Sequence, residues 1–442
     1  MVRALLVALL VLAPTPAWGQ DTDPLLSQPQ KPPLPKRAMP DYDGLPPPGP
    51  DAVEVVAWVP RVALFPVWLA TEYAIRQPLH LLVVAAEKGN WPSELISFFT
   101  FGNQNFGIVP TVFVDLGFRP IFGVYFFYDG PGIYSLRVRG TGTIDGFGIS
   151  VANRFRTDEA GSRFVLQGDV NLAPDRAFYG IGPNTLESDI SRYGLLRAGG
   201  SLSYDWHVTR GIRIIDTFGI HTNDFKEPRC CTGIPVSDLP TPPPGFPDGY
   251  TAMTERIEAL FDSRPPRPDS QTGVRLRLEF EHSTDLRGSG NWVRGGGTLG
   301  GFLDFGRWRI LGLTFTTELA APLSGEVPFP ELIAFGGTGI AMPGLRTNRL
   351  YGQSAVAASL RYEWPIWVAL GGTLQVECGN VFGPGYEGFA ADKLRLSFAF
   401  GFRTVGEPDH NFQVLIGTGT ETFAQGASLE SIRFVIGSTY GF

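Results

Sequence analysis

Most of this chain alternates apolar and polar residues one by one, and that pattern constrains the fold more than any other feature. In segment 394–403, one face carries Leu394, Leu396, Phe398, Phe400 and Phe402, whereas the other carries Arg395, Ser397, Ala399, Gly401 and Arg403. Successive side chains of a strand point to opposite faces, so the segment is predicted to be a two-faced strand. Charged side chains must lie in water or be paired. In a closed barrel the apolar face contacts lipid on the outside, and the charged face lies in a hydrated lumen.

Sixteen segments of this kind occur from residue 104 onward. They are predicted at 106–116, 119–128, 133–141, 147–156, 163–172, 193–206, 210–222, 252–263, 272–283, 292–305, 308–320, 353–365, 367–379, 392–403, 411–420 and 431–442. Bacterial outer-membrane barrels have an even number of antiparallel strands. The sequence therefore predicts an all-β membrane protein, a 16-stranded antiparallel transmembrane β-barrel over residues 104–442.

The connections between these segments differ systematically in length. Those that follow even-numbered strands are short, such as "DGPG" and "HVTRG". Most that follow odd-numbered strands are longer, notably 173–192, 223–251 and 321–352. Outer-membrane barrels have short periplasmic turns and longer extracellular loops. We therefore expect the first strand to run outward and the chain to end on the periplasmic side.

The last segment, "SIRFVIGSTYGF", is predicted to close the barrel. Phe434, Ile436, Tyr440 and Phe442 share its apolar face and form a candidate C-terminal barrel signal. Taken alone, this segment also fits the half-buried last strand of a soluble sandwich. The composition favours the barrel, because charged residues are only 18% while aromatic residues are 12% and glycines number 55.

The first hundred residues have a different character. Residues 1–19 are predicted to be a secretory signal peptide, with Arg3, a short apolar run and small residues before the cleavage point. Residues 20–50 are a proline-rich linker. Residues 51–103 are apolar and helix-like but interrupted by prolines, which leaves the pieces too short to span a bilayer. We expect a short amphipathic helical segment in the periplasm, lying on the membrane or in the barrel mouth; a small helical layer packed on the domain is the alternative.

No catalytic or cofactor-binding constellation is present in the sequence. The five histidines have no ligand spacing, and the three cysteines, Cys230, Cys231 and Cys378, form no zinc pattern, while their disulfide state stays open. The glycine-rich run 293–301 lies inside a strand pattern, so bends explain it better than phosphate binding. The net charge of −7 and the lack of a basic stripe argue against nucleic acid. We expect no enzymatic activity, no cofactor and no metal.

Three stretches resemble one family of proteins. They are "DRAFYGIGPNT", which holds Phe178, Tyr179 and Gly180, then "FGGTGIAMPGLRTNRLYGQSAVAASLRYEWPI", and finally the tail that ends in Phe442. Together and in this order they resemble the BamA/TamA-type outer-membrane protein superfamily, also called the bacterial surface antigen family. The resemblance covers residues 104–442. It implies a sixteen-stranded barrel that inserts barrel proteins or carries polypeptides or lipids across the outer membrane.

The resemblance also assigns a role to loop 321–352. In this family the sixth outer loop folds into the lumen and carries an Arg-Gly-aromatic motif whose arginine docks on acidic wall residues. Here Gly344 matches the glycine, but Pro343 and Leu345 replace its neighbours. The loop is therefore expected in the lumen with an altered motif.

An arginine further along the loop is the candidate for this docking. Glu377 aligns with the acidic wall position of the family, and alternation places it on the inward face of its strand. We hypothesise that Arg346, or failing that Arg349, pairs with Glu377 or Glu363 and pins the loop by a buried charge pair. The alternative is that these are ordinary hydrated lumen charges.

The functional expectation is insertion or translocation of proteins or lipids at the cell outer membrane. Its alternatives are a passive solute channel or a surface antigen that transports nothing. The family's periplasmic repeats have no counterpart between residues 20 and 104, so we expect a short member that lacks them. Expected partners are outer-membrane lipids including lipopolysaccharide, the barrel assembly machinery and a client polypeptide or lipid. The proposed family mechanism is lateral opening of the seam between the first and last strands.

Overall fold

The computed structural model describes eight ranges, together with isolated residues between 65 and 94. The ranges are 97–130, 132–231, 233–264, 272–306, 308–337, 341–367, 370–404 and 412–438. The chain divides into two compact units, and the barrel belongs to the unit that contains residues 95–442. The predicted signal peptide and linker lie outside the described residues, as do most of segment 51–103 and the last four residues, including Tyr440 and Phe442.

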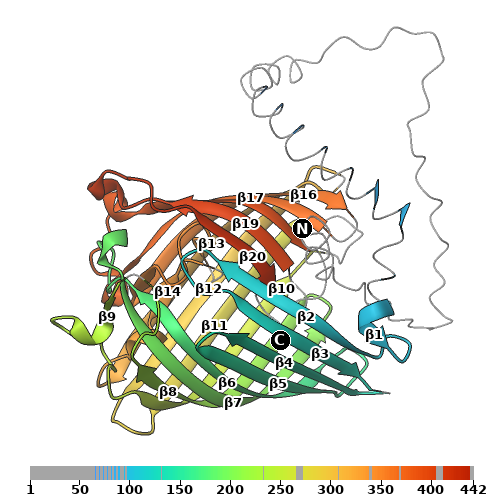
Figure 1. Cartoon of the computed structure of the whole chain (residues 1–442), viewed down its shortest axis with the longest axis horizontal. Coiled ribbons are helices and arrows are strands. Elements are labelled where there is room, and N and C mark those ends of the chain that lie inside the picture. Colours follow the sequence, from blue (N-terminus) through green and yellow to red (C-terminus); the bar gives the residue numbers. More distant parts are fainter. Residues whose placement is uncertain are drawn as a thin grey trace. The chain divides into compact units, whose positions relative to one another are not determined.

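Sixteen antiparallel strands form a closed barrel (Figure 1). In ring order they are β2 (Phe106–Asp115), β3 (Ile121–Asp129), β4 (Tyr134–Thr143), β5 (Gly146–Arg156), β6 (Arg163–Phe178), β7 (Ser191–Thr209), β8 (Ile212–Lys226), β10 (Tyr250–Asp262), β11 (Gly273–Asp285), β12 (Asn291–Asp304), β13 (Ile310–Ser324), β16 (Ser354–Trp367), β17 (Leu370–Phe382), β18 (Arg395–Thr404), β19 (Phe412–Gly419) and β20 (Arg433–Ser438). The ring closes where β20 pairs with β2. The described residues contain no helix that is both long and apolar enough to cross a membrane.

Each of the sixteen predicted strands coincides with one observed strand, which confirms the predicted fold class. The main correction concerns strand length. β6 runs on to Phe178 and β13 to Ser324, so the connections predicted at 173–192 and 321–352 begin in strand. At these ends the outward residues are no longer regularly apolar, while the backbone ladder continues. Alternation alone therefore placed the strand ends too early.

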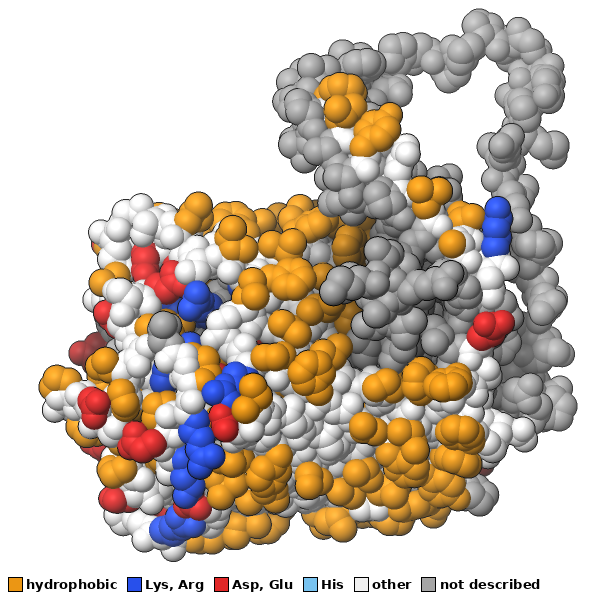
Figure 2. Space-filling view, in the orientation of Figure 1, with side chains coloured by type: hydrophobic (Ala, Val, Ile, Leu, Met, Phe, Trp, Pro, Cys, Tyr) orange, Lys and Arg blue, Asp and Glu red, His pale blue; other side chains and the backbone are white. Residues whose placement is uncertain are grey.

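The two faces of the wall differ as the alternation predicts. On β11, Val274, Leu278 and Phe280 are each about half exposed on the outside, whereas Arg277 and Glu279 face inward and form an ion pair. Figure 2 shows apolar side chains spread over the wall and charged ones gathered at the end where β9 (Ile234–Pro235) lies. That end carries the long connections and is called the outer end below. An apolar wall around a closed ladder fits a lipid bilayer.

The outer half of the barrel is filled by side chains. The connection between β13 and β16, residues 325–353 and hereafter the lumen loop, contains η4 (Phe329–Glu331) and a small hairpin of β14 (Ile333–Phe335) and β15 (Leu350–Gly352). Its residues Phe335, Met342 and Leu345 are buried against inward-facing residues of the barrel wall. A second cluster joins Phe329 to inward aromatic residues of β6, β7, β10 and β12. The lumen loop thus lies inside the barrel, as expected.

Candidate functional site at the lumen loop and the strand seam

Glycines let the lumen loop turn and lie against the wall. Gly336 and Gly337 have φ of 108° and 79°, a region that side chains rarely adopt. Gly344 donates its backbone N–H to the Ser397 hydroxyl at 2.8 Å. A Cβ on Gly344 would lie 2.4 Å from the carbonyl oxygens of Phe398 and Thr418, so only glycine allows this approach to β18 and β19. Gly344 therefore lets the lumen loop lie directly against the wall.

Glu377 also holds the loop, although not through an arginine. Its carboxylate is buried and accepts hydrogen bonds from the Met342 backbone N–H and from the Gln375 side chain. Met342 lies next to Pro343, at the start of the altered motif. The donor to Glu377 from the lumen loop is thus the Met342 backbone N–H, where an arginine side chain was expected.

The two candidate arginines have other partners than those expected. Arg346 lies 3.4 Å from Glu187 of η2 (Glu187–Asp189) in the third outer loop, residues 179–190. Glu363 pairs with Arg403 of the neighbouring wall and lies 3.8 Å from Arg361. The hypothesised pairs of Arg346 or Arg349 with Glu377 or Glu363 are therefore wrong. Arg346 and Arg349 follow the turn at Met342 and extend toward the outer loops, away from these two carboxylates.

Arg349 lies in a fully buried group of four charges, the outer charge cluster, formed by Arg349, Arg395, Glu421 and Glu430. The Arg349 guanidinium lies 3.1 Å from Glu421 and 2.9 Å from Glu430. Arg395, at the start of β18, pairs with the same two carboxylates. Both arginine side chains are completely buried. Buried charges are tolerated only when paired and hydrogen-bonded, and this cluster meets that condition.

The third outer loop completes the cluster. Arg349 donates to the Thr185 hydroxyl and carbonyl, both at 2.9 Å, and Arg395 donates to the Thr185 carbonyl at 2.6 Å. Burial raises the pKa of Glu430 to about 6, with Arg349 opposing the shift and Glu421 adding to it. The cluster therefore ties together the lumen loop, the third outer loop and the last outer loop, residues 420–432.

The outer-loop motif packs on the same loop. Phe178 stacks edge-on against Phe329 with ring centroids 5.1 Å apart. The Tyr179 ring lies under the Arg349 guanidinium at 4.9 Å, a cation–π contact. Gly180 has φ of 97° and turns the chain after the aromatic pair. Phe178 and Tyr179 thus form part of the surface against which the lumen loop packs.

A further carboxylate anchors η4 of the lumen loop. Glu331 accepts hydrogen bonds from His221 Nε2 at 2.9 Å and from the Tyr250 hydroxyl at 2.6 Å. Burial by itself raises its pKa. The hydrogen bond from His221 and the nearby Arg197 outweigh burial, so that the pKa of Glu331 falls to about 2.

The seam between β2 and β20 carries a buried ion pair at its outer end. The described ladder joins Phe113, Val114 and Asp115 to Gly437, Ile436 and Val435. Asp115 and Arg433, the seam pair below, are 2% and 1% exposed. Arg433 donates from Nε to Oδ1 of Asp115 at 3.1 Å and from Nη2 to Oδ2 at 2.9 Å. This is the bidentate geometry of strong arginine–carboxylate pairs.

The lumen loop touches the seam pair at two points. The Thr347 hydroxyl donates to Asp115 Oδ2 at 2.9 Å. The Pro343 carbonyl accepts from Arg433 Nη1 at 2.8 Å. Loop and seam therefore share one hydrogen-bonded group, so that a movement of either one disturbs the other.

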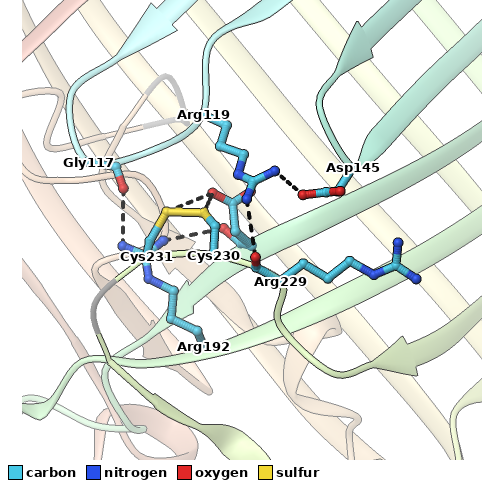
Figure 3. The surroundings of a disulfide bond; sticks show 8 residues. Gly117, Arg119, Asp145, Arg192, Arg229, Cys230 and Cys231 are labelled. Atoms are coloured by element: carbon cyan, nitrogen blue, oxygen red, sulfur yellow. Dashed lines mark hydrogen bonds and ion pairs between the residues drawn. A yellow bond between two sulfur atoms is a disulfide. The ribbon is translucent and has the colours of Figure 1, made fainter.

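The two adjacent cysteines are joined in the structure. Cys230 and Cys231 form a disulfide, while Cys378 is free (Figure 3). Asp175 Oδ2 lies 3.2 Å from the Cys230 sulfur, and Arg119 donates to the Arg229 carbonyl at 3.1 Å. Among the described residues, Asp175 with these cysteines is the one group spaced to hold a metal ion, and disulfide sulfurs offer no thiolate for it.

Several residues of this site had no signal in the sequence. Glu421 and Glu430 stand in an outer loop, where alternation stops, and the strand-end residues Asp115, Arg395 and Arg433 carry no cue to their partners. Arg395 and Arg433 do show one cue, since each occupies the inward face at the start of an apolar strand. In the C-terminal signal, Phe434 and Ile436 alternate with buried inward residues of β20, whereas its last two members lie outside the described residues.

Comparisons with known proteins define the fold. No protein-family model and no curated protein matches the chain. Among solved structures, the chain is similar to BamA from Haemophilus ducreyi lacking POTRA domains 1–3, at 14% identity and a TM-score of 0.53 over 76% of this chain and 70% of that chain. CdiB from Acinetobacter baumannii (10% identity, TM-score 0.48, 76% and 60% covered) and OccK10 from Pseudomonas aeruginosa (10%, 0.31, 76% and 98%) are more distant and add no argument. The chain is thus an outer-membrane-type β-barrel.

Proposed function

We propose that this chain is a member of the BamA/TamA-type superfamily that inserts or translocates proteins or lipids at the outer membrane by lateral opening of the β2–β20 seam. The observation that carries the proposal is the seam pair of Asp115 and Arg433, to which the lumen loop is hydrogen-bonded through Thr347 and Pro343. In this proposal the loop holds the seam closed until it is displaced.

The packing of the lumen loop supports this function over that of a passive channel. Phe329 and Phe335 are fully buried, and the loop is tied to the wall by Glu331, Glu377 and the outer charge cluster. A sixteen-stranded barrel leaves an aqueous channel unless something fills it. Because the lumen loop fills the outer half of the barrel, the proposal favours passage of a client through the β2–β20 seam rather than through the lumen.

The remaining expectations belong to the same proposal. The barrel acts without catalysing a reaction and without a cofactor. Its partners are outer-membrane lipids including lipopolysaccharide, the assembly machinery that inserts it, and a client polypeptide or lipid. The segment 51–103 lies in the periplasm.

A reversible tether across the seam tests the proposal. Val114→Cys and Ile436→Cys change directly opposed residues of β2 and β20, and a matched control pair, Phe126→Cys and Val138→Cys, tethers β3 to β4. Both pairs are made with Cys378→Ser. In vesicles we expect the oxidised seam tether to abolish insertion of an unfolded barrel client and lipid exchange between leaflets, and the control tether to abolish neither.

Single-channel recording on the same proteins separates the alternatives. Small, flickering currents that the seam tether suppresses support lateral opening. A large steady conductance that the seam tether leaves unchanged would identify a passive channel. If the untethered protein shows neither transport nor current, the function is that of a structural surface protein.

A further inference from the structure

A polar cavity of about 240 Å³ lies inside the barrel between β11, β12, β13, β16 and β17, beneath Ala341 of the lumen loop. Its volume comes from small residues on the two central strands. A Cβ on Gly300 would lie 2.8 Å from Thr314, and one on Gly312 would lie 2.9 Å from the Phe302 ring. Larger residues at these two positions would therefore collide with Thr314 and Phe302, which line the same cavity.

The strand register places hydroxyl groups on the floor and arginines on both rims. Arg275 of β11 is paired with Gly300 of β12, Gly300 with Thr314 of β13, and Thr314 with Ser359 of β16. Arg361, two residues beyond Ser359, lines the opposite rim. Thr298 and Thr316 add further hydroxyls in the next row and hydrogen-bond each other at 3.1 Å. Every one of these residues faces the lumen.

Most charges around the cavity already have partners. Arg277 lies 3.0 Å from Glu258 and 2.8 Å from Glu279. Glu377 is the one carboxylate in the lining, and it is occupied by the Met342 amide and Gln375. Among the described residues, however, Arg275 has no hydrogen bond and no ion pair.

The surroundings of Arg275 are rich in positive charge. Arg213, Arg264 and Arg277 all act on it, but each of these three is held by a carboxylate of its own, so that Arg275 is the arginine of the group that is left without a partner in the described part of the chain. Arg361 on the other rim is close enough to Arg275 to repel it, and its Nε donates to the Gln375 side chain at 3.0 Å. An arginine that faces the lumen with no carboxylate bonded to it is available to pair with an anion that enters the cavity.

We propose that this cavity binds a phosphate group, with Arg275 and Arg361 as its principal ligands and the hydroxyls of Thr314 and Ser359 as additional donors. A guanidinium matches phosphate oxygens in a bidentate manner, and hydroxyls satisfy the remaining ones. The volume of about 240 Å³ is large enough to hold a phosphate group. The group belongs either to free phosphate or to the headgroup of an anionic phospholipid. The inference does not depend on the proposed function.

Titration of the full chain in a neutral detergent tests the site. The probes are inorganic phosphate and a short-chain phosphatidic acid below its micelle concentration, with binding followed by calorimetry. We expect saturable binding that Arg275→Gln and Arg361→Gln each weaken about tenfold or more, since each removes one charge-assisted contact. Arg275→Lys keeps the charge and should retain part of the affinity.

A matched control and a folding check keep the test decisive. Arg137→Gln removes a lumen arginine on the opposite wall, where it lies 2.7 Å from Asp129, and should change affinity by less than about twofold. All variants must keep heat-modifiable gel migration. Tighter binding of phosphatidic acid than of phosphate would assign the site to a lipid headgroup, and equal binding would assign it to phosphate itself. Absence of saturable binding of both probes, or an equal loss in Arg137→Gln, would overturn the proposal, whatever the seam tether shows.

Discussion

Replacing Asp115 by Asn should loosen the seam and the contact of the lumen loop with it. The change removes one member of a pair that is almost completely buried, and the Arg433 guanidinium then stays in the closed seam without its carboxylate. Removing one partner of a buried pair costs about 3–5 kcal/mol. Arg433 keeps its bond to the Pro343 carbonyl at 2.8 Å, so we expect the lower end, about 3 kcal/mol. At roughly 1.4 kcal/mol for each factor of ten, the open population should rise about a hundredfold.

Thiol labelling measures that population. Val435 of β20 is fully buried on the inward face beside Arg433, and Val435→Cys with Cys378→Ser offers a single reactive thiol, since Cys230 and Cys231 are joined. If the seam closes faster than a water-soluble maleimide reacts, the labelling rate follows the open population. Asp115→Asn should then raise this rate about a hundredfold.

A matched pair elsewhere in the wall provides the control. Asp205 is 4% exposed and accepts two hydrogen bonds from Arg213 across β7 and β8, away from the seam. Asp205→Asn should leave the labelling of Val435→Cys within about twofold. The reasoning fails if Asp115→Asn changes the rate by less than about threefold, or if Asp205→Asn accelerates it equally.

Three further predictions concern the lumen loop. The pKa of Glu331 is about 2, below its value in the unfolded chain, so its contribution to the free energy of unfolding is complete above about pH 4.5 and is lost as the pH falls toward 2. Glu331→Gln should therefore remove up to roughly 3 kcal/mol of pH-dependent stability, measured by thermal unfolding in detergent. Gly344→Ala should lower the temperature of heat-modifiable migration, because its methyl would meet two carbonyl oxygens, whereas Gly301→Ala enters open space and should not. Arg349→Gln leaves two buried carboxylates with one arginine and should cost about 3–5 kcal/mol, measured as protease cleavage of the outer loops at lower temperature.

The barrel could be predicted from sequence because each strand is specified by the alternation of its own neighbouring residues. Each strand shows its two faces in its own residues, as Leu278 and Glu279 do on β11, and sixteen repetitions leave one plausible closed arrangement. The strand ends were harder to place, because Phe178 and its neighbours continue the ladder past the part of the strand whose outward side is regularly apolar.

The candidate site could be predicted only in part. Gly344 and Glu377 could be singled out from the sequence, but Glu377 accepts from the Met342 backbone N–H and not from the arginine that was expected. The partners of Arg346 and Arg349 could not be found, because a loop has no period from which to read a direction. Asp115 and Arg433 are 318 positions apart and meet only because the barrel closes.

The bonds around Arg349 extend in one direction to the third outer loop and in the other toward the seam. Thr185, buried in the third outer loop, is bonded to Arg349, which follows Thr347 by two residues, and Thr347 is bonded to Asp115. A molecule that binds the exposed neighbours of Thr185, Asn184 and Leu186, would therefore act on the closing strands from the outer end of the barrel. Binding at this turn would then either hold the seam closed or release it, depending on the direction in which the turn is displaced.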